Sequence, residues 1–157
     1  MPSHYSRTGV TFLVPDGWKV SEDDLDGVVR GITLNTPSNG SCMVDLYRTE
    51  QAPLLDKYIK TQIRHFAEAL AFGFKIVEGP HSSVEKARHQ SHEVLGTTVR
   101  YVIRSLWLTR SRYTDSYFRL ELGSHTAMCS LRCADDEVSL LRPGFKEILE
   151  SFHAYIT

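Results

Sequence analysis

The 157-residue sequence has no long apolar run and no segment typical of an export signal. Its uninterrupted apolar stretches are only a few residues long, against the ~20 residues that a membrane-spanning helix needs. The polar start from Met1 to Arg7 and the break at Pro15-Asp16-Gly17 leave no room for the apolar core of a signal peptide. With Met1 as the native start, these absences predict a cytoplasmic protein.

Cysteine and net charge are also scarce. The three cysteines form no CxxC pair, which predicts reduced, buried thiols rather than a disulfide framework. With 18 Lys and Arg against 19 Asp and Glu, the formal net charge is -1. Neither sign dominates at a distance, so no general attraction to nucleic acid or to an anionic membrane is expected. Phosphate-binding glycine loops and the GxSxG nucleophile motif are missing too, and no cofactor is predicted.

Alternating apolar and polar residues predict several strands on either side of a helix. Before the helix the strands are 10–14, 28–34 and 42–48, and after it 74–78, a region around 84, 94–108, 113–122 and 126–133. The two strands that flank Asn35 to Gly40 form a hairpin, and residues 109–112 and 123–124 are the turns of a later meander. The acidic stretch from Glu22 to Asp26 is interpreted as a solvated loop.

Two helices are predicted from apolar residues at helical spacing. The first begins near Pro53 and is capped by Gly73, and its apolar positions are Leu55, Ile59, Ile63, Phe66 and Leu70. The second begins at Pro143, with a stripe of Phe145, Ile148, Leu149 and Phe152. The element order β-β-β-α-β-β-β-β-α indicates an α+β fold, in one domain over residues 1–157. Its antiparallel sheet has about six or more strands and is flanked by the two helices.

A group of imidazoles and a carboxylate is the one candidate metal site. His81, His89, His92 and Glu93 lie within thirteen residues, and such groups ligate catalytic zinc. The spacing differs from HExxH, in which both histidines lie one helical turn apart, so exposed loop histidines are the simpler interpretation. A metal-dependent hydrolase built on these residues stays an alternative.

Arginine and aromatic residues gather between residues 96 and 132, and this combination is typical of protein interfaces and of single-stranded nucleic-acid platforms. It also fits a solvated sheet face whose arginine stems cover apolar neighbours. The candidate partner-binding residues are Tyr101, Arg104, Trp107, Arg112, Tyr117 and Arg119, with Met43 and Tyr47 beside them.

The opening Gly9-Val10-Thr11-Phe12-Leu13-Val14-Pro15-Asp16-Gly17-Trp18 and the closing Ile148-Leu149-Glu150-Ser151-Phe152 resemble the PsbP-like α/β/α sandwich superfamily. The element order between them agrees over nearly the whole chain. Members include DcrB-type envelope lipoproteins and related chaperones that load type VI secretion effectors. The resemblance implies a non-catalytic binding scaffold and carries over no catalytic residue.

The leading hypothesis is therefore a bacterial-type cytosolic module that binds another polypeptide, as an adaptor or a secretion-effector chaperone. Besides the metal-dependent hydrolase, the alternative is a binder of a small ligand or single-stranded nucleic acid through the arginine and aromatic strands. Nucleic acid is the less expected partner because the chain has no net positive charge. An open sheet edge would allow a homodimer.

Overall fold

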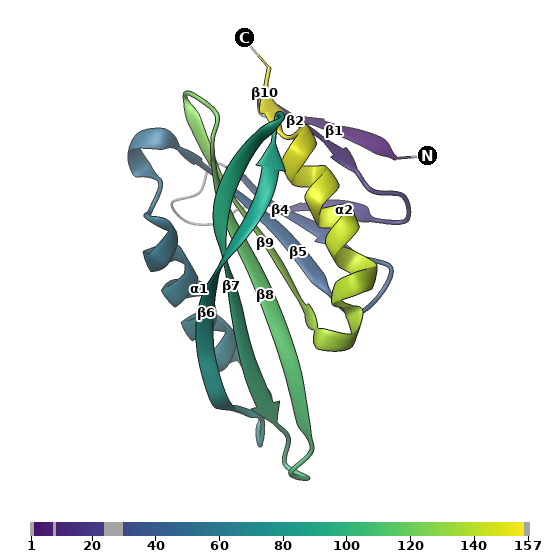
Figure 1. The fold of residues 1–157 in the computed structure, drawn as a ribbon, viewed down its shortest axis with the longest axis vertical. Coiled ribbons are helices and arrows are strands. Elements are labelled where there is room, and N and C mark those ends of the chain that lie inside the picture. Colours follow the sequence, from purple (N-terminus) through teal and green to yellow (C-terminus); the bar gives the residue numbers. More distant parts are fainter. Residues whose placement is uncertain (1, 8, 24–29, 156–157) are drawn as a thin grey trace.

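A computed structural model of the protein describes residues 2–7, 9–23 and 30–155 (Figure 1). The strands before the first helix are β1 (Ser3–Arg7), β2 (Val10–Val14), β3 (Lys19–Asp23), β4 (Arg30–Asn35) and β5 (Ser41–Arg48). Helix α1 (Leu55–Ala69) is followed by β6 (Lys75–His89), β7 (His92–Arg104), β8 (Arg110–Glu121) and β9 (His125–Ala134). Helix α2 (Val138–Ser151) and the short β10 (His153–Ala154) end the fold.

Seven of these strands form one antiparallel sheet, in the order β3-β4-β5-β9-β8-β7-β6. Strands β1, β2 and β10 form a separate three-stranded sheet. The hairpin predicted around Asn35 to Gly40 is confirmed, since β4 pairs antiparallel with β5. The predicted α+β class, with a large antiparallel sheet and two helices, is therefore correct.

The two helices cover opposite faces of the large sheet, because alternate residues of each strand pack against different helices. In β8, Phe118 and Leu120 pack in the cluster that contains the buried face of α2. Their neighbour Tyr117 packs in the cluster that contains Tyr58 and Ile59 of α1. Figure 1 shows α1 and α2 on either side of the sheet, and both stop short of the lower end, where the β7–β8 hairpin continues.

The small three-stranded sheet also packs against α2 and the residue that follows it. Phe12 of β2 stacks on Phe152 just after α2, with ring centroids 4.9 Å apart, and both side chains are buried. Trp18, which follows the predicted turn, packs against α2 at Gly144, where an added Cβ would lie 2.7 Å from the indole. Burial of Phe152 is thus as the apolar stripe of the second predicted helix indicates.

Three strands lie outside the sequence-based order: β1, β3 and β10. The prediction of separate strands at 74–78 and around 84 is wrong, because both segments belong to the single strand β6. Strand β3 contains Glu22 and Asp23, so the interpretation of these two residues as loop is wrong. The strand is a polar edge whose side chains are mostly exposed, and it therefore lacks the apolar alternation by which strands are recognised. Residues 24–26 of the predicted loop, and residues 28 and 29 of the predicted strand, lie outside the described residues.

The helix ends also differ from the prediction. Helix α2 begins at Val138, so Pro143 lies inside it rather than at its start. Buried Leu141 extends the apolar stripe towards the N-terminus. Pro143 has no N–H to donate to the Ser139 carbonyl, and because Ser139 is exposed, water can bond to that carbonyl instead.

Gly73 does not cap α1, which already ends at Ala69. The glycine has φ +85° in a turn closed by a 2.9 Å bond from the Phe74 N–H to the Ala71 carbonyl, and the third residue of a type II turn requires that conformation.

No helix among the described residues has both the length and the apolar character needed to span a membrane.

Candidate functional site

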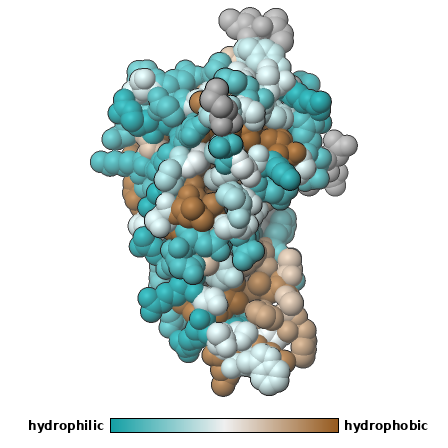
Figure 2. Space-filling model, turned by 90° about the vertical axis from the view of Figure 1, so that its right-hand side faces the viewer, coloured by the Kyte–Doolittle hydropathy of each residue, from teal (hydrophilic) through white to brown (hydrophobic). Residues whose placement is uncertain are grey.

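An apolar surface lies at the lower end of the molecule, where the β7–β8 turn meets the connection from α1 to β6. Phe72 is 94% exposed and Trp107 is 85% exposed. Figure 2 shows hydrophobic surface gathered at this lower end. We call this surface the apolar tip and define it by Phe72, Phe74, Leu106, Trp107 and Leu108, all of which are exposed. Contiguous exposed apolar surface marks interaction sites in soluble proteins.

The apolar tip is held in a defined shape by the β7–β8 turn. The Ser105 N–H donates to the Thr109 carbonyl over 2.8 Å, and the Leu108 N–H donates to the Ser105 carbonyl over 3.0 Å. Leu108 takes φ +62°, a left-handed conformation that costs a bulky residue about 1–3 kcal/mol. The turn therefore keeps the Leu108 side chain exposed, although its left-handed conformation lowers the stability of the fold.

The predicted turn at Thr109 to Arg112 is wrong, because Arg110 already begins β8. The turn lies four residues earlier, and the predicted strand 94–108 is correspondingly too long. The apolar run Leu106-Trp107-Leu108 looks like strand sequence, yet it forms the turn itself. An apolar turn between two strands rich in arginine was the signal that could have located the tip.

A cavity of about 650 Å³ opens beside the apolar tip. One wall consists of apolar side chains from α1 and its C-terminal connection, and the other carries hydroxyl groups from β7, β8 and the turn between them. The lining residues include Phe66, Leu70, Phe74, Ile103, Ser105, Ser111 and Tyr113.

A row of arginines occupies the α2-facing side of the sheet below the end of α2. Directly paired residues of antiparallel strands point to the same face, and Arg104 pairs with both Lys75 and Arg110. Two further pairs, Val102 with Arg112 and Arg100 with Thr114, continue this face. We call it the arginine face and define it by Lys75, Arg100, Arg104, Arg110 and Arg112.

The arginine face is poorly neutralised. Arg110 pairs with Glu78 over 3.1 Å, and both side chains are more than half exposed. Within the described parts of the chain, the side chains of Lys75, Arg100, Arg104 and Arg112 make no hydrogen bond or ion pair.

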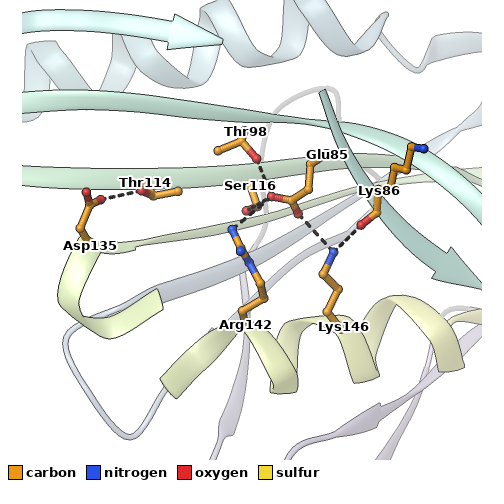
Figure 3. A network of polar contacts seen from close by, with 8 residues as sticks. All are labelled: Glu85, Lys86, Thr98, Thr114, Ser116, Asp135, Arg142 and Lys146. Atoms are coloured by element: carbon orange, nitrogen blue, oxygen red, sulfur yellow. Dashed lines mark hydrogen bonds and ion pairs between the residues drawn. The ribbon is translucent and has the colours of Figure 1, made fainter. Parts of the chain in front are cut away.

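A polar network marks the border between α2 and the arginine face (Figure 3). The Glu85 carboxylate accepts hydrogen bonds from Thr98 at 2.5 Å and Ser116 at 3.0 Å. Arg142 and Lys146 of α2 reach the same carboxylate at 3.4 and 3.5 Å. Arg142 and Lys146 thereby tie α2 to β6 at Glu85.

The tyrosines lie on the opposite face, beneath α1. Tyr101 and Tyr117 are 2% and 1% exposed, and both donate hydrogen bonds to Asp115, at 2.9 and 2.7 Å. Arg132 binds the same carboxylate at 2.9 Å and lies over the Phe66 ring. Burial and the charge of Asp115 raise the pKa of both tyrosines. Burial alone would lower the pKa of Arg132, but the hydrogen bonds and charge of Asp115 raise it.

The structure therefore separates the predicted partner-binding residues. It brings Arg104, Trp107 and Arg112 together at the lower end, on or beside the exposed surface. Tyr101 and Tyr117 are buried, so their side chains do not form a surface of the folded chain.

The remaining three predicted residues lie away from the lower end. Met43 and Tyr47 are half-buried on β5, on the face that α1 covers. Burial and the charge of Asp45 raise the pKa of Tyr47 to about 12. Arg119 donates a hydrogen bond to the Pro53 carbonyl at 3.2 Å and pairs with Glu121.

The four residues of the alternative metal site do not lie together. His89 pairs with His92 across the β6–β7 turn, whereas His81 lies eight residues along β6, opposite Arg100. That separation is roughly 26 Å at about 3.3 Å per strand residue. The His89 Nε2 atom is 2.6 Å from the Phe152 carbonyl oxygen, a structural contact to the end of α2. Among residues 2–7, 9–23 and 30–155, no three His, Cys, Asp or Glu side chains are placed to hold a metal ion.

The three cysteines are free and buried, as predicted. Burial raises the pKa of Cys42 and Cys129, and it raises the pKa of Cys133 to about 11. All three thiols are thereby kept protonated and unreactive at neutral pH.

The sequence matches no protein-family model and no curated protein. Its fold is similar to solved structures over nearly the whole chain. PsbP of the cyanobacterium Synechocystis sp. PCC 6803 superposes with a TM-score of 0.57 at 15% identity, covering 98% of this chain and 92% of that chain. The Ran-binding protein Mog1p of Saccharomyces cerevisiae gives 0.55 at 13% identity, with coverage of 98% and 95%. A mutant of the protein Mog1 gives 0.58 at 13% identity, with coverage of 100% and 97%. The chain therefore has the PsbP-like α/β fold.

Proposed function

We propose that this protein is a non-catalytic module that binds another polypeptide through the apolar tip. The observation that carries the proposal is Trp107, which is 85% exposed between two exposed leucines at the end of a hairpin. Tryptophan, together with arginine, is enriched among the residues that dominate binding energy in protein interfaces. The solved structure of Mog1p, whose fold this chain shares, is described as that of a Ran-binding protein. A cytosolic adaptor or a chaperone for a secretion effector is the role that we favour.

Two features support a polypeptide over the alternatives. The tyrosines of β7 and β8 lie on the α1 side of the sheet, whereas Arg104, Arg110 and Arg112 lie on the α2 side. A single-stranded nucleic-acid platform needs stacking aromatics and cations on one surface. The apolar tip, with cations behind it, has instead the composition of an interface with an apolar centre and a polar rim.

Site-specific photo-crosslinking in the native cell tests the proposal. A photoreactive amino acid replaces Trp107, and in a matched control it replaces Val84, which is 73% exposed on β6 and remote from the tip. We expect a discrete protein adduct from position 107 that position 84 does not give. The proposal is wrong if neither position gives an adduct or if both give the same ones.

The purified partner then permits a quantitative test. Replacing Trp107 by Ala should weaken its binding by about 30-fold or more, the loss typical of a central interface residue. Leu140→Ala, at a residue 63% exposed on α2, is the control and should leave the affinity unchanged.

A further inference from the structure

The arginine face carries like charges that the fold itself does not need. Lys75, Arg104 and Arg110 stand side by side across β6, β7 and β8, since Arg104 pairs directly with the other two. Adjacent strands are about 4.8 Å apart, and like charges directly opposite each other destabilise a sheet. Glu78 forms an ion pair with Arg110, and Glu78 and Asp135 line the same hollow as Arg100 and Arg112. Among the described residues, no ion pair reaches Lys75 or Arg104. Adjacent like charges that the fold offsets only in part are typical of a functional surface.

We infer, on the basis of the proposed function, that the arginine face binds an acidic stretch of the polypeptide partner. Alternate side chains of an extended peptide project to one side at intervals of about 6.7 Å. Arg110 and Arg112, two residues apart on β8, present cations at the same interval. Each guanidinium offers a planar fork that matches a carboxylate. The partner segment is therefore extended, with Asp or Glu at alternate positions.

The same geometry favours carboxylates over a nucleic-acid backbone. Tyr101 and Tyr113 pair directly with each other on the α1 side of the sheet, so neither can stack a base on the arginine face. The formal net charge of -1 also provides no long-range attraction for a polyphosphate. The positive charge of the arginine face is local. It can therefore bind a short acidic segment of a partner that is already held by the apolar tip.

The direct test uses a fluorescent synthetic peptide with Glu at alternate positions and a matched peptide with Gln in their place. We expect fluorescence anisotropy to detect binding of the Glu peptide at low salt, weakened by salt, and at least tenfold weaker binding of the Gln peptide. The double variant Arg104→Gln/Arg112→Gln should lose at least tenfold in affinity for the Glu peptide. The control Arg48→Gln/Arg64→Gln makes the same change in net charge at exposed arginines elsewhere and should retain binding.

Other outcomes overturn the inference. Equal binding of the Glu and Gln peptides, or equal losses in the two double variants, would show that the arginine face does not select acidic residues. Tighter binding of a thymidine oligonucleotide, or of vesicles of phosphatidylserine and phosphatidylcholine, that is lost in Arg104→Gln/Arg112→Gln would assign the face to phosphate groups instead.

A stability measurement checks the premise of unrelieved repulsion. Because Arg104 lies between two cations, Arg104→Gln should raise Tm by about 2 °C at low salt, and the gain should shrink as salt screens the charges. An unchanged or lowered Tm at low salt contradicts the premise. Trp107→Ala, which tests the proposed function, should leave binding of the Glu peptide intact. A crosslinked adduct at position 107, without selective binding of the Glu peptide, would therefore refute the role of the arginine face and leave the proposed function standing.

Discussion

Gly73 and Leu106 lie in contact across two turns that are 33 residues apart in the sequence: a Cβ atom added to Gly73 would be 2.8 Å from the Cβ of Leu106. One turn connects α1 to β6 and the other connects β7 to β8. This close approach joins both halves of the apolar tip and requires a residue without a side chain.

Replacing Gly73 by Ala should destabilise the fold for two reasons. The left-handed φ of +85° costs an alanine about 1–2 kcal/mol, and the contact with Leu106 adds to that cost. Gly123→Ala is the matched control, because Gly123 has φ +86° but no atom within 4 Å of the added Cβ. Urea denaturation should show a larger loss at Gly73 by about 1 kcal/mol or more. Equal losses would mean that the two turns are not held together.

The two tryptophans should respond in opposite ways to truncation. Trp18 is 9% exposed and packs on Gly144, so Trp18→Ala should cost about 3 kcal/mol of unfolding free energy by leaving a cavity. Trp107→Ala should change stability by less than about 0.5 kcal/mol, since the side chain is 85% exposed. Chemical denaturation of both variants checks this assignment, which a large loss at Trp107 would refute.

Asp45 makes stability depend on pH. Its carboxyl is buried, the Tyr58 hydroxyl donates to Oδ2 at 2.6 Å, and Oδ1 has no hydrogen-bond partner among the described residues. Burial raises the pKa of Asp45 above its ordinary 3.8, although the bond from Tyr58 lowers it in part. For an acid whose pKa is raised by folding, the stabilising contribution is fully present below the unfolded pKa. It is lost as pH rises through the folded pKa.

Asp45→Asn should therefore stabilise the protein at pH 7 and have little such effect below pH 3.8, where both forms are neutral. The amide oxygen of Asn can still accept the Tyr58 hydrogen bond. Unfolding free energies of the two proteins across this pH range provide the measurement. If Asp45→Asn raised the unfolding free energy equally at pH 7 and at the acid end of the range, the charge of Asp45 would be excluded as the cause.

The Asp115–Arg132 pair should contribute strongly to the free energy of unfolding. Asp115 is 1% exposed, and Arg132 binds it through Nε and Nη2. Arg132→Ala leaves a buried carboxylate without its counter-ion, at a cost of about 3–5 kcal/mol. Arg110→Ala, which breaks the exposed pair with Glu78, should cost less than about 1 kcal/mol. Thermal or urea unfolding of both variants provides the measurement. A loss of stability in Arg132→Ala as small as that in Arg110→Ala would show that buried Asp115 does not need Arg132 as its counter-ion.

The sequence predicts most of the fold because buried residues follow regular periods. The apolar stripe of α2 and the alternation of Phe118 and Leu120 in β8 each identify an element and its inward face. Strand β3 escapes prediction because an exposed edge strand needs no apolar alternation. The position of Pro143 misled because proline favours a first helical turn, whereas here packing of Leu141 overrides that preference.

The candidate site was predictable only in part. Arg104, Trp107, Arg112, Tyr101 and Tyr117 were all candidates for one binding surface. Alternation along a strand places Tyr101 opposite to Arg104, but it does not show that α1 buries the tyrosine side of the sheet. The position of the turn decides which residues leave the sheet. Placing it at residue 109 instead of residue 105 assigns Leu106, Trp107 and Leu108 to a strand, so the apolar tip is not predicted. Phe72 joins the site because its neighbour Gly73 lies against Leu106, a tertiary contact that no local pattern reveals.

Because both helices stop short of the lower end, the molecule is divided into an upper half, where side chains pack between helix and sheet, and a lower half, where many side chains are exposed. The apolar tip and the arginine face belong largely to the second half. New residues there can arise without unfolding the chain, so partner choice can diverge while the scaffold is preserved. The β7–β8 turn is for the same reason the place to graft a foreign recognition loop onto this protein.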